Sequence, residues 1–101
     1  MIIYNVTLKV SRTVSTPWLQ WMKETHIKEM LATALFHDYR FCRLLEQDDT
    51  EDLTFVVQYY SKSIEHYQDY LKYHANAMRQ KGLERFGEKV LAFRTLMETL
   101  D

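Results

Sequence analysis

Residues that interrupt regular structure are scarce in this sequence, which has Gly 2 and Pro 1 among its 101 residues. This scarcity excludes a collagenous or linker-rich chain. The single cysteine, Cys42, excludes an internal disulfide and favours a reducing, cytoplasmic setting. No segment approaches the roughly 18 consecutive apolar residues of a membrane span, and no leader pattern precedes the first predicted strand, so no membrane partner is expected.

An excess of one charge is also lacking, because Lys+Arg 13 balance Asp+Glu 14 to give a net charge of -1. A chain without a positive field is not expected to recruit nucleic acid. What is abundant is apolar surface: hydrophobic residues make up 47% and aromatic residues 14% of the chain. This composition predicts an ordered globular chain that folds as a single domain over residues 1–101.

Strand-like patterns occur in four segments. The first, Ile2–Val10, alternates apolar with more polar residues and so has one well-buried face. The segments Tyr39–Leu45 and Leu53–Tyr60 are rich in β-branched or aromatic residues and are predicted to form a hairpin. Their acidic connection, Glu46–Asp52, lacks the glycine and the ligand spacing of a calcium loop, so we interpret it as a solvated hairpin end. The last strand, Lys89–Met97, is apolar on both faces.

Helical periodicity predicts two helices. The first covers Pro17–Thr33, with Thr16 as its N-cap and with Ala34 after its end, where a left-handed conformation would cost roughly 1 kcal/mol. Its apolar stripe consists of Trp18, Leu19, Met22, His26 and Met30. The second helix is predicted to open with Ser63 and to end at Gly82. Its stripe consists of Ile64, Tyr67, Leu71, His74, Ala75 and Met78.

The resulting order is β-α-β-β-α-β, which predicts an α+β, ferredoxin-like fold: a four-stranded antiparallel sheet with two helices on one face. Two short helices cover only one face of such a sheet, yet the strands carry apolar residues on both faces. The uncovered face is therefore expected to form an exposed apolar patch that serves as an interface. A homodimer through this sheet face is the simplest assembly.

Three segments carry a resemblance to a known family: the opening MIIYNVT, the helix motif WLQWMKETHIKEML and the segment YHANAMRQKGLERFGEKVLAFRTLME. With them, nearly the whole chain resembles a bacterial domain-of-unknown-function family. The resemblance implies a fold more than an activity, because that family is similar to the dimeric α+β barrels, in which two ferredoxin-like subunits pack sheet against sheet. Two positions depart from the family pattern, since Ala34 replaces a glycine and Asn76 replaces a proline.

Two histidines are the first candidates for a ligand site. His26 and His74 lie on the two predicted helix stripes, which face the same side of one sheet, so both can line one pocket. The alternative, and the more common situation, is that His26 is a buried neutral imidazole satisfied by a backbone carbonyl. No carboxylate or cysteine stands at ligand spacing from the pair, so no metal site is expected.

Arg94 is the second kind of candidate, because it stands in an otherwise apolar strand and its guanidinium must be paired or must reach solvent. It is interpreted either as one half of a salt bridge across the dimer or as an anchor for an anionic small-molecule ligand. The set of candidate ligand-contacting residues is completed by Trp21 on the first helix, by Tyr59 in a tyrosine-rich region and by Asn5 on the first strand.

The sequence contains no catalytic signature, since Cys42 has no identifiable base and neither a phosphate loop nor a serine nucleophile motif occurs. Three function classes stay open: a ligand-binding or regulatory homodimer, a cofactor-independent or haem-related oxygenase-like enzyme of the same fold, and a structural or protein-interaction module. A cavity reaching His26 or His74 would favour the first two. Haem-degrading dimeric α+β barrels use an asparagine, a tryptophan and a histidine; only Asn5 and His74 match, so no haem or other cofactor is expected.

Overall fold

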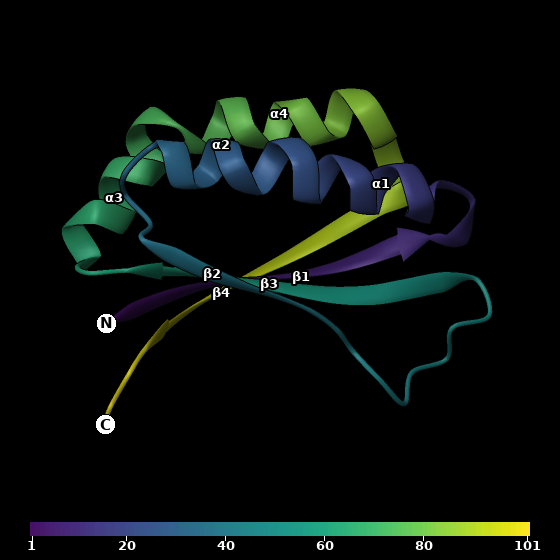
Figure 1. Ribbon diagram of the computed structural model, residues 1–101, viewed down its shortest axis with the longest axis horizontal. Coiled ribbons are helices and arrows are strands. Elements are labelled where there is room, and N and C mark those ends of the chain that lie inside the picture. Colours follow the sequence, from purple (N-terminus) through teal and green to yellow (C-terminus); the bar gives the residue numbers. More distant parts are fainter.

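The computed structural model describes residues 1–101 and has the predicted α+β, ferredoxin-like fold. Its strands are β1 (Ile2–Ser11), β2 (Asp38–Arg43), β3 (Asp52–Ser61) and β4 (Val90–Glu98). They form one antiparallel sheet in the order β2-β3-β1-β4, so the first and last strands of the chain lie side by side. Figure 1 shows that the helices lie on one side of this sheet and leave its other side open.

The first helical segment has three parts: α1 (Ser15–Trp21), a π-helical turn η2 (Met22–His26) and α2 (Ile27–Ala32). It starts before the predicted Pro17, because a 3-10 turn, η1 (Arg12–Val14), carries the chain directly from β1 into the helix. The prediction of Thr16 as the N-cap is therefore wrong. Instead, Ser11 caps η1 by accepting a hydrogen bond from the backbone N–H of Thr13 at 3.4 Å.

The end of α2 includes a left-handed alanine. Ala34 has a φ of 65°, and its N–H donates to the carbonyl of Leu31 at 3.0 Å. Thr33 supports the same turn by donating its hydroxyl to the carbonyl of Met30 at 2.7 Å. These hydrogen bonds offset the cost of the left-handed conformation, which is about 1 kcal/mol for alanine.

The second helical segment is broken in two. Its first part, α3 (Ile64–Tyr73), opens with Ser63 as predicted, and the Ser63 hydroxyl accepts a hydrogen bond from the N–H of His66 at 3.2 Å. His74 then leaves the helical conformation, with φ -129° and ψ -31°. The second part, α4 (Ala75–Phe86), starts immediately after it.

This break changes which side chains of the second segment face the core. Ile64 and Leu71, which the predicted stripe contains, are 37% and 40% exposed, whereas Tyr70 is buried. The stripe is therefore wrong at these positions. Beyond the break, Ala75 and Met78 are buried, as the periodicity predicted.

The predicted helix end at Gly82 is also wrong, because α4 continues through this glycine. The helix ends instead at Gly87, which has a φ of 57° and ψ of -136°, followed by the 3-10 turn η3 (Gly87–Lys89). Only glycine adopts such a conformation readily. Gly82 lies inside α4, where it faces the first helical segment.

The register of the sheet determines which side of each strand meets the helices. Tyr4, Val6 and Leu8 of β1 are buried beneath the helical layer. Arg94 lies directly opposite Val6 in the β1–β4 ladder, so its side chain projects toward the helices as well. Asn5 lies between Tyr4 and Val6 and therefore points to the open side of the sheet.

The core fills the space between the sheet and the helices, where 17 buried residues form one cluster. Aromatic rings contribute much of it: Trp18 lies 5.1 Å from Phe55 between ring centroids. On the open side of the sheet, by contrast, Leu91 and Phe93 are 51% and 55% exposed. None of the helices has the length and apolar character needed to cross a membrane.

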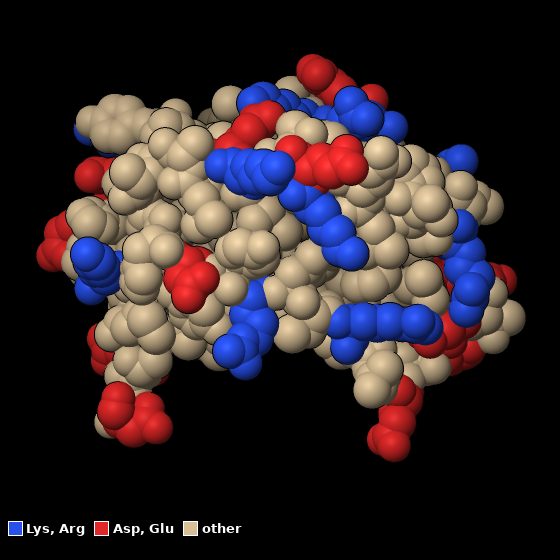
Figure 2. Space-filling model, viewed as in Figure 1, with Lys and Arg blue, Asp and Glu red and all other residues tan.

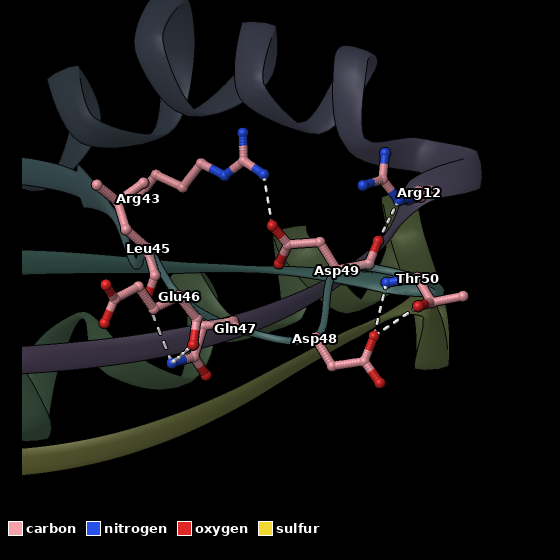
Figure 3. A network of polar contacts seen from close by, with 8 residues as sticks. All are labelled: Arg12, Arg43, Leu45, Glu46, Gln47, Asp48, Asp49 and Thr50. Atoms are coloured by element: carbon pink, nitrogen blue, oxygen red, sulfur yellow. Dashed lines mark hydrogen bonds and ion pairs between the residues drawn. The ribbon is translucent and has the colours of Figure 1, made fainter.

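The acidic β2–β3 connection is held by neighbouring arginines (Figure 3). Arg43 Nη2 lies 2.7 Å from Asp49 Oδ2, and Arg12 Nε donates to the Asp49 carbonyl oxygen. Asp48 accepts a hydrogen bond from the N–H of Thr50 at 3.1 Å. The chain contains no group of three or more His, Cys, Asp or Glu residues that could hold a metal ion, in this loop or elsewhere.

Candidate functional site

A cavity of about 330 Å³ lies between the helical layer and the sheet. Its floor is the buried row Tyr4, Val6 and Leu8 of β1, together with helix-facing residues of β4. Its roof comes from α1, the π-helical turn, α2 and α4. Most of the lining is apolar or aromatic, and a few polar side chains reach into it, which is typical of a small-molecule site.

The lining of the cavity extends along β1. Its floor extends from Tyr4 to Leu8, which is about 13 Å at the usual rise of a strand. Its α4 side extends from Met78 to Phe86, which is about 12 Å at the usual rise of a helix. The two lengths agree, and the contact of Arg79 with Tyr4 shows that both elements begin at the same end of the cavity.

At this end, a cluster of tyrosines lies beside two arginines. The ring centroid of Tyr4 is 6.2 Å from that of Tyr59 and 5.6 Å from that of Tyr70. Arg79 Nη2 donates to the Tyr4 hydroxyl at 3.4 Å, and Arg94 lines the same cavity from β4. Burial raises the pKa of both Tyr59 and Tyr70, so their hydroxyls stay protonated at neutral pH and can donate hydrogen bonds.

Neither of these arginines has an acidic partner. The ion pairs of the structure are Arg43–Asp49 and Lys81–Glu29. The interpretation of Arg94 as half of a salt bridge across a sheet-to-sheet dimer therefore has no support, because Arg94 projects to the helix side and a subunit packed on the open side would meet Phe93. Arg79 and Arg94 both present uncompensated positive charge to the cavity.

The other end of the cavity is aromatic and includes His26. The imidazole stacks on the Trp21 ring with centroids 4.6 Å apart and an interplanar angle of 23°. Trp21 also meets Phe86 of α4 edge-on at 5.5 Å. Gly82 of α4 lies so close to the same ring that a Cβ there would be 3.6 Å from Trp21 Cη2. The two helical segments therefore converge on Trp21.

The π-helical turn explains why Trp21 and His26 share this end. In a regular α-helix, residues five positions apart are rotated by about 140° around the axis, and the predicted stripe therefore omitted Trp21. The π-helical turn, Met22–His26, has i→i+5 hydrogen bonds, and it brings both rings to one face. Such turns are frequent at functional sites.

His26 is a neutral imidazole. Burial lowers its pKa from 6.5 to about 4, while Glu29 raises the pKa and Lys81 lowers it to smaller extents. Its Nδ1 atom is buried and has no hydrogen-bond partner. The alternative in which a backbone carbonyl satisfies this histidine is therefore wrong for Nδ1, because the ring is held by stacking on Trp21.

The structure brings some of the predicted site residues together and separates others. The cavity is lined by Trp21, His26, Tyr59 and Arg94. His74 does not line it, and the expectation that both histidines share a pocket is wrong because the break at His74 takes this residue out of the helical phase. Asn5 lies on the open side of the sheet, where its amide contacts Thr7 at 3.4 Å and Gln58 at 3.3 Å.

Sequence reasoning missed Arg79, Tyr4 and Tyr70 as residues of this site. The tyrosines could be recognised only as apolar positions of a strand or helix. Arg79 had one weak signal, because it follows Met78 and so lies at the edge of the predicted stripe. That signal does not show that a guanidinium meets a tyrosine hydroxyl 75 positions away.

Comparisons with known proteins agree with the observed fold. A family model described as "Domain of unknown function (DUF4286)" matches residues 1–100. A search of curated proteins found no match. Among solved structures, a dimeric ferredoxin-like protein from an uncultured marine organism has a TM-score of 0.76 at 10% identity, with 99% of this chain and 95% of that chain covered.

Two further solved structures are similar over almost their whole length. An ethyl tert-butyl ether D (EthD) family protein from Bacillus halodurans C-125 has a TM-score of 0.70 at 14% identity, with 99% of this chain and 100% of that chain covered. A candidate antibiotic biosynthesis monooxygenase from Deinococcus radiodurans has a TM-score of 0.70 at 16% identity, with 100% of this chain and 94% of that chain covered. At these identities the likeness is one of fold.

Proposed function

The chain belongs to DUF4286, a family described as a domain of unknown function, and from this premise we propose that the protein is a small-molecule-binding homodimer. The observation that carries the proposal is the cavity of about 330 Å³ that reaches His26. Protein interiors are normally packed without such spaces, and a structural module has no need of one. The mostly apolar lining with a few polar side chains is that of a ligand pocket.

The open side of the sheet supports the homodimer part of the proposal. Leu91, Phe93 and Met97 of β4 are 51%, 55% and 37% exposed there. Beside them, Gln58 donates to the side-chain oxygen of Asn5 at 3.3 Å. Apolar surface next to ordered polar groups is typical of a protein interface. The dimeric ferredoxin-like protein of similar fold agrees with this assembly.

Light scattering coupled to gel filtration tests the homodimer. We expect a mass of about twice the 12.2 kDa of the chain at micromolar concentration. Phe93→Asp should dissociate the dimer by placing a charge in the interface. Leu100→Asp is the matched control, because Leu100 is 92% exposed beyond the end of β4. A wild-type mass near 12.2 kDa would contradict the homodimer.

A neutral probe, 2-naphthalenemethanol, tests the cavity. Its fluorescence should report saturable binding to the wild-type protein. Ala92→Phe should reduce the affinity by about tenfold or more, because Ala92 lines the cavity and a larger ring occupies the space. Ala77→Phe adds the same group on the exposed side of α4 and should leave binding unchanged. Equal binding to the two folded variants would contradict the proposed site.

An oxygenase-like enzyme is the second candidate function. Its support is the fold that this chain shares with the candidate antibiotic biosynthesis monooxygenase. The haem-dependent version is not favoured, because Asn5 lies on the open side of the sheet and His74 lies outside the cavity. Added hemin should give no Soret change that depends on His74, whereas a saturable shift that disappears in His74→Ala would favour the haem enzyme.

The domain organisation, the cellular compartment and the kind of partner are also part of the proposal. We propose a single domain over residues 1–101, since one cluster of buried residues connects the sheet with both helical segments. The exposed, unpaired Cys42 supports a reducing cytoplasmic setting. Figure 2 shows Lys and Arg interspersed with Asp and Glu over the helical layer, and such a surface does not favour nucleic acid as a partner.

A further inference from the structure

The cavity has one charged end and one aromatic end, and this asymmetry points to the class of its ligand. We propose that the ligand is an elongated amphipathic anion: Arg79 and Arg94 bind its anionic group, and its apolar body extends toward Trp21. This inference rests on the proposed function, because it names the ligand class for the same cavity.

The two guanidiniums come from different elements but belong to the lining of one cavity. Arg79 is on α4 and Arg94 is on β4, yet both line the cavity. Burial raises the pKa of Tyr67 and Tyr70, and the charges of both arginines oppose this rise at both hydroxyls. The geometry agrees, because Arg79 contacts the Tyr4 hydroxyl and Arg94 lies opposite Val6, the next residue on the same face of β1. Two guanidiniums on one anionic group are a strong binding arrangement.

The surroundings of the arginines leave them available to a ligand. Neither forms an ion pair with a carboxylate, since the acidic partners of the structure belong to Arg43 and Lys81. Both guanidiniums belong to exposed residues, so their charge persists without a partner in the unliganded protein. The Tyr4 hydroxyl accepts its hydrogen bond from Arg79, which leaves its own hydrogen free to donate to an anion.

The mouth of the cavity lies beside these arginines. The lining residues whose exposed side chains face the helices are Arg79 and Leu83 of α4 and Arg94 of β4. An anionic group held between α4 and β4 therefore remains at the water boundary, where its desolvation is incomplete. The apolar body then enters the space between β1 and the helices.

The opposite end suits a ring system or an apolar chain. Trp21, Phe86 and the methionines Met22 and Met30 line the interior, and the floor is about 13 Å long from Tyr4 to Leu8. Aromatic and methionine side chains adapt to flat apolar groups and gain from contact with them. A two-ring aromatic carboxylate has both of the required parts.

A matched pair of probes tests the inference: 2-naphthoate, which is anionic, and 2-naphthalenemethanol, which is neutral. The wild-type protein should bind 2-naphthoate about a hundredfold more tightly, because each of the two charged hydrogen bonds adds about tenfold in affinity. Arg79→Met and Arg94→Met should each lower this preference about tenfold and leave the affinity for the alcohol unchanged. Added salt should weaken binding of the naphthoate only.

Arg40→Met is the control, since it removes an exposed guanidinium from β2 at a residue that does not line the cavity. It should keep the preference for 2-naphthoate. Thermal melts accompany every variant. If Arg79→Met is destabilised by loss of the Tyr4 contact, Arg79→Gln replaces it, because the amide can still donate to the hydroxyl without a charge.

The outcomes separate this inference from the proposed function. Equal affinity of the wild-type protein for the two probes, or an unchanged preference in both arginine variants, overturns the anion site while the cavity still binds small molecules. Absence of binding for both probes overturns the proposed function and the anion site together. Loss of the preference in Arg40→Met as well would show a general effect of charge and would also overturn the assignment.

Discussion

The two sides of the sheet are built from the same strands but have opposite properties. On the covered side, Tyr4, Val6 and Leu8 are at most 9% exposed and pack beneath the helices. On the open side, Asn5 takes part in a network of amides, and Phe93 is 55% exposed. The covered side therefore carries subunit stability and the cavity, whereas the open side is available for the proposed homodimer.

The largest expected effect comes from a matched pair of phenylalanines on the two sides. Phe55→Ala on the covered side should cost about 3–5 kcal/mol of unfolding free energy, because Phe55 is 5% exposed in the core. Phe93→Ala on the open side should cost less than about 1 kcal/mol of subunit stability. Urea unfolding at several protein concentrations separates the two effects, since a dimer contact shows a concentration dependence. Similar losses for both variants would contradict this difference between the two sides of the sheet.

The pH dependence of stability tests the state of His26 on the covered side. Its pKa in the folded protein is lowered from 6.5 to about 4, so the unfolded chain binds more protons between these values. Its contribution should be fully present above about pH 6.5 and should fall as the pH drops toward 4, by about 3 kcal/mol in total.

The measurement compares wild type with His26→Gln by urea unfolding from pH 7 to pH 4. Wild type should lose more stability than the variant, because glutamine does not titrate and the carboxylates titrate in both proteins. His37→Gln is the control, as His37 is exposed. A parallel pH dependence of wild type and His26→Gln would show that the imidazole is not held neutral by burial.

The smallest effect concerns the two glycines of the chain. Gly82 lies inside α4 over the covered side of the sheet, and Gly87 lies at the end of this helix. Gly82→Ala should raise the unfolding free energy by up to about 1 kcal/mol, because alanine favours the interior of α4. Its Cβ would meet Trp21 at an ordinary contact distance of 3.6 Å. Gly87→Ala should lower the free energy by about 1–3 kcal/mol, because its φ is 57° and its ψ is -136°. Thermal melts with changes of equal sign would contradict this assignment.

Much of the fold depends on local patterns and could be predicted from the sequence. The alternation in β1 determines two faces, one of them buried, because side chains alternate along any strand. Ser63 opens α3 because its hydroxyl reaches a backbone N–H only three residues away. The order of elements, and with it the ferredoxin-like topology, follows from such short-range signals.

The candidate site, however, could be identified only from the tertiary structure. Alternation leaves Asn5 on one face and Val6 on the other, but only the packed helices decide which of these faces is covered. The π-helical turn at Met22–His26 and the break at His74 change the helical phase in ways that a regular period of 3.6 residues cannot predict.

The cavity itself has no signature in the sequence, because Trp21, Arg79 and Arg94 belong to three separate elements. Local patterns report which side of a strand or helix is apolar, because neighbouring residues share one backbone geometry. Whether the space between two apolar sides is filled depends on the shapes of side chains from distant segments that meet only after folding. The sequence alone therefore determined the elements and their order, and the tertiary structure decided which side is covered, which residues converge and where the cavity lies.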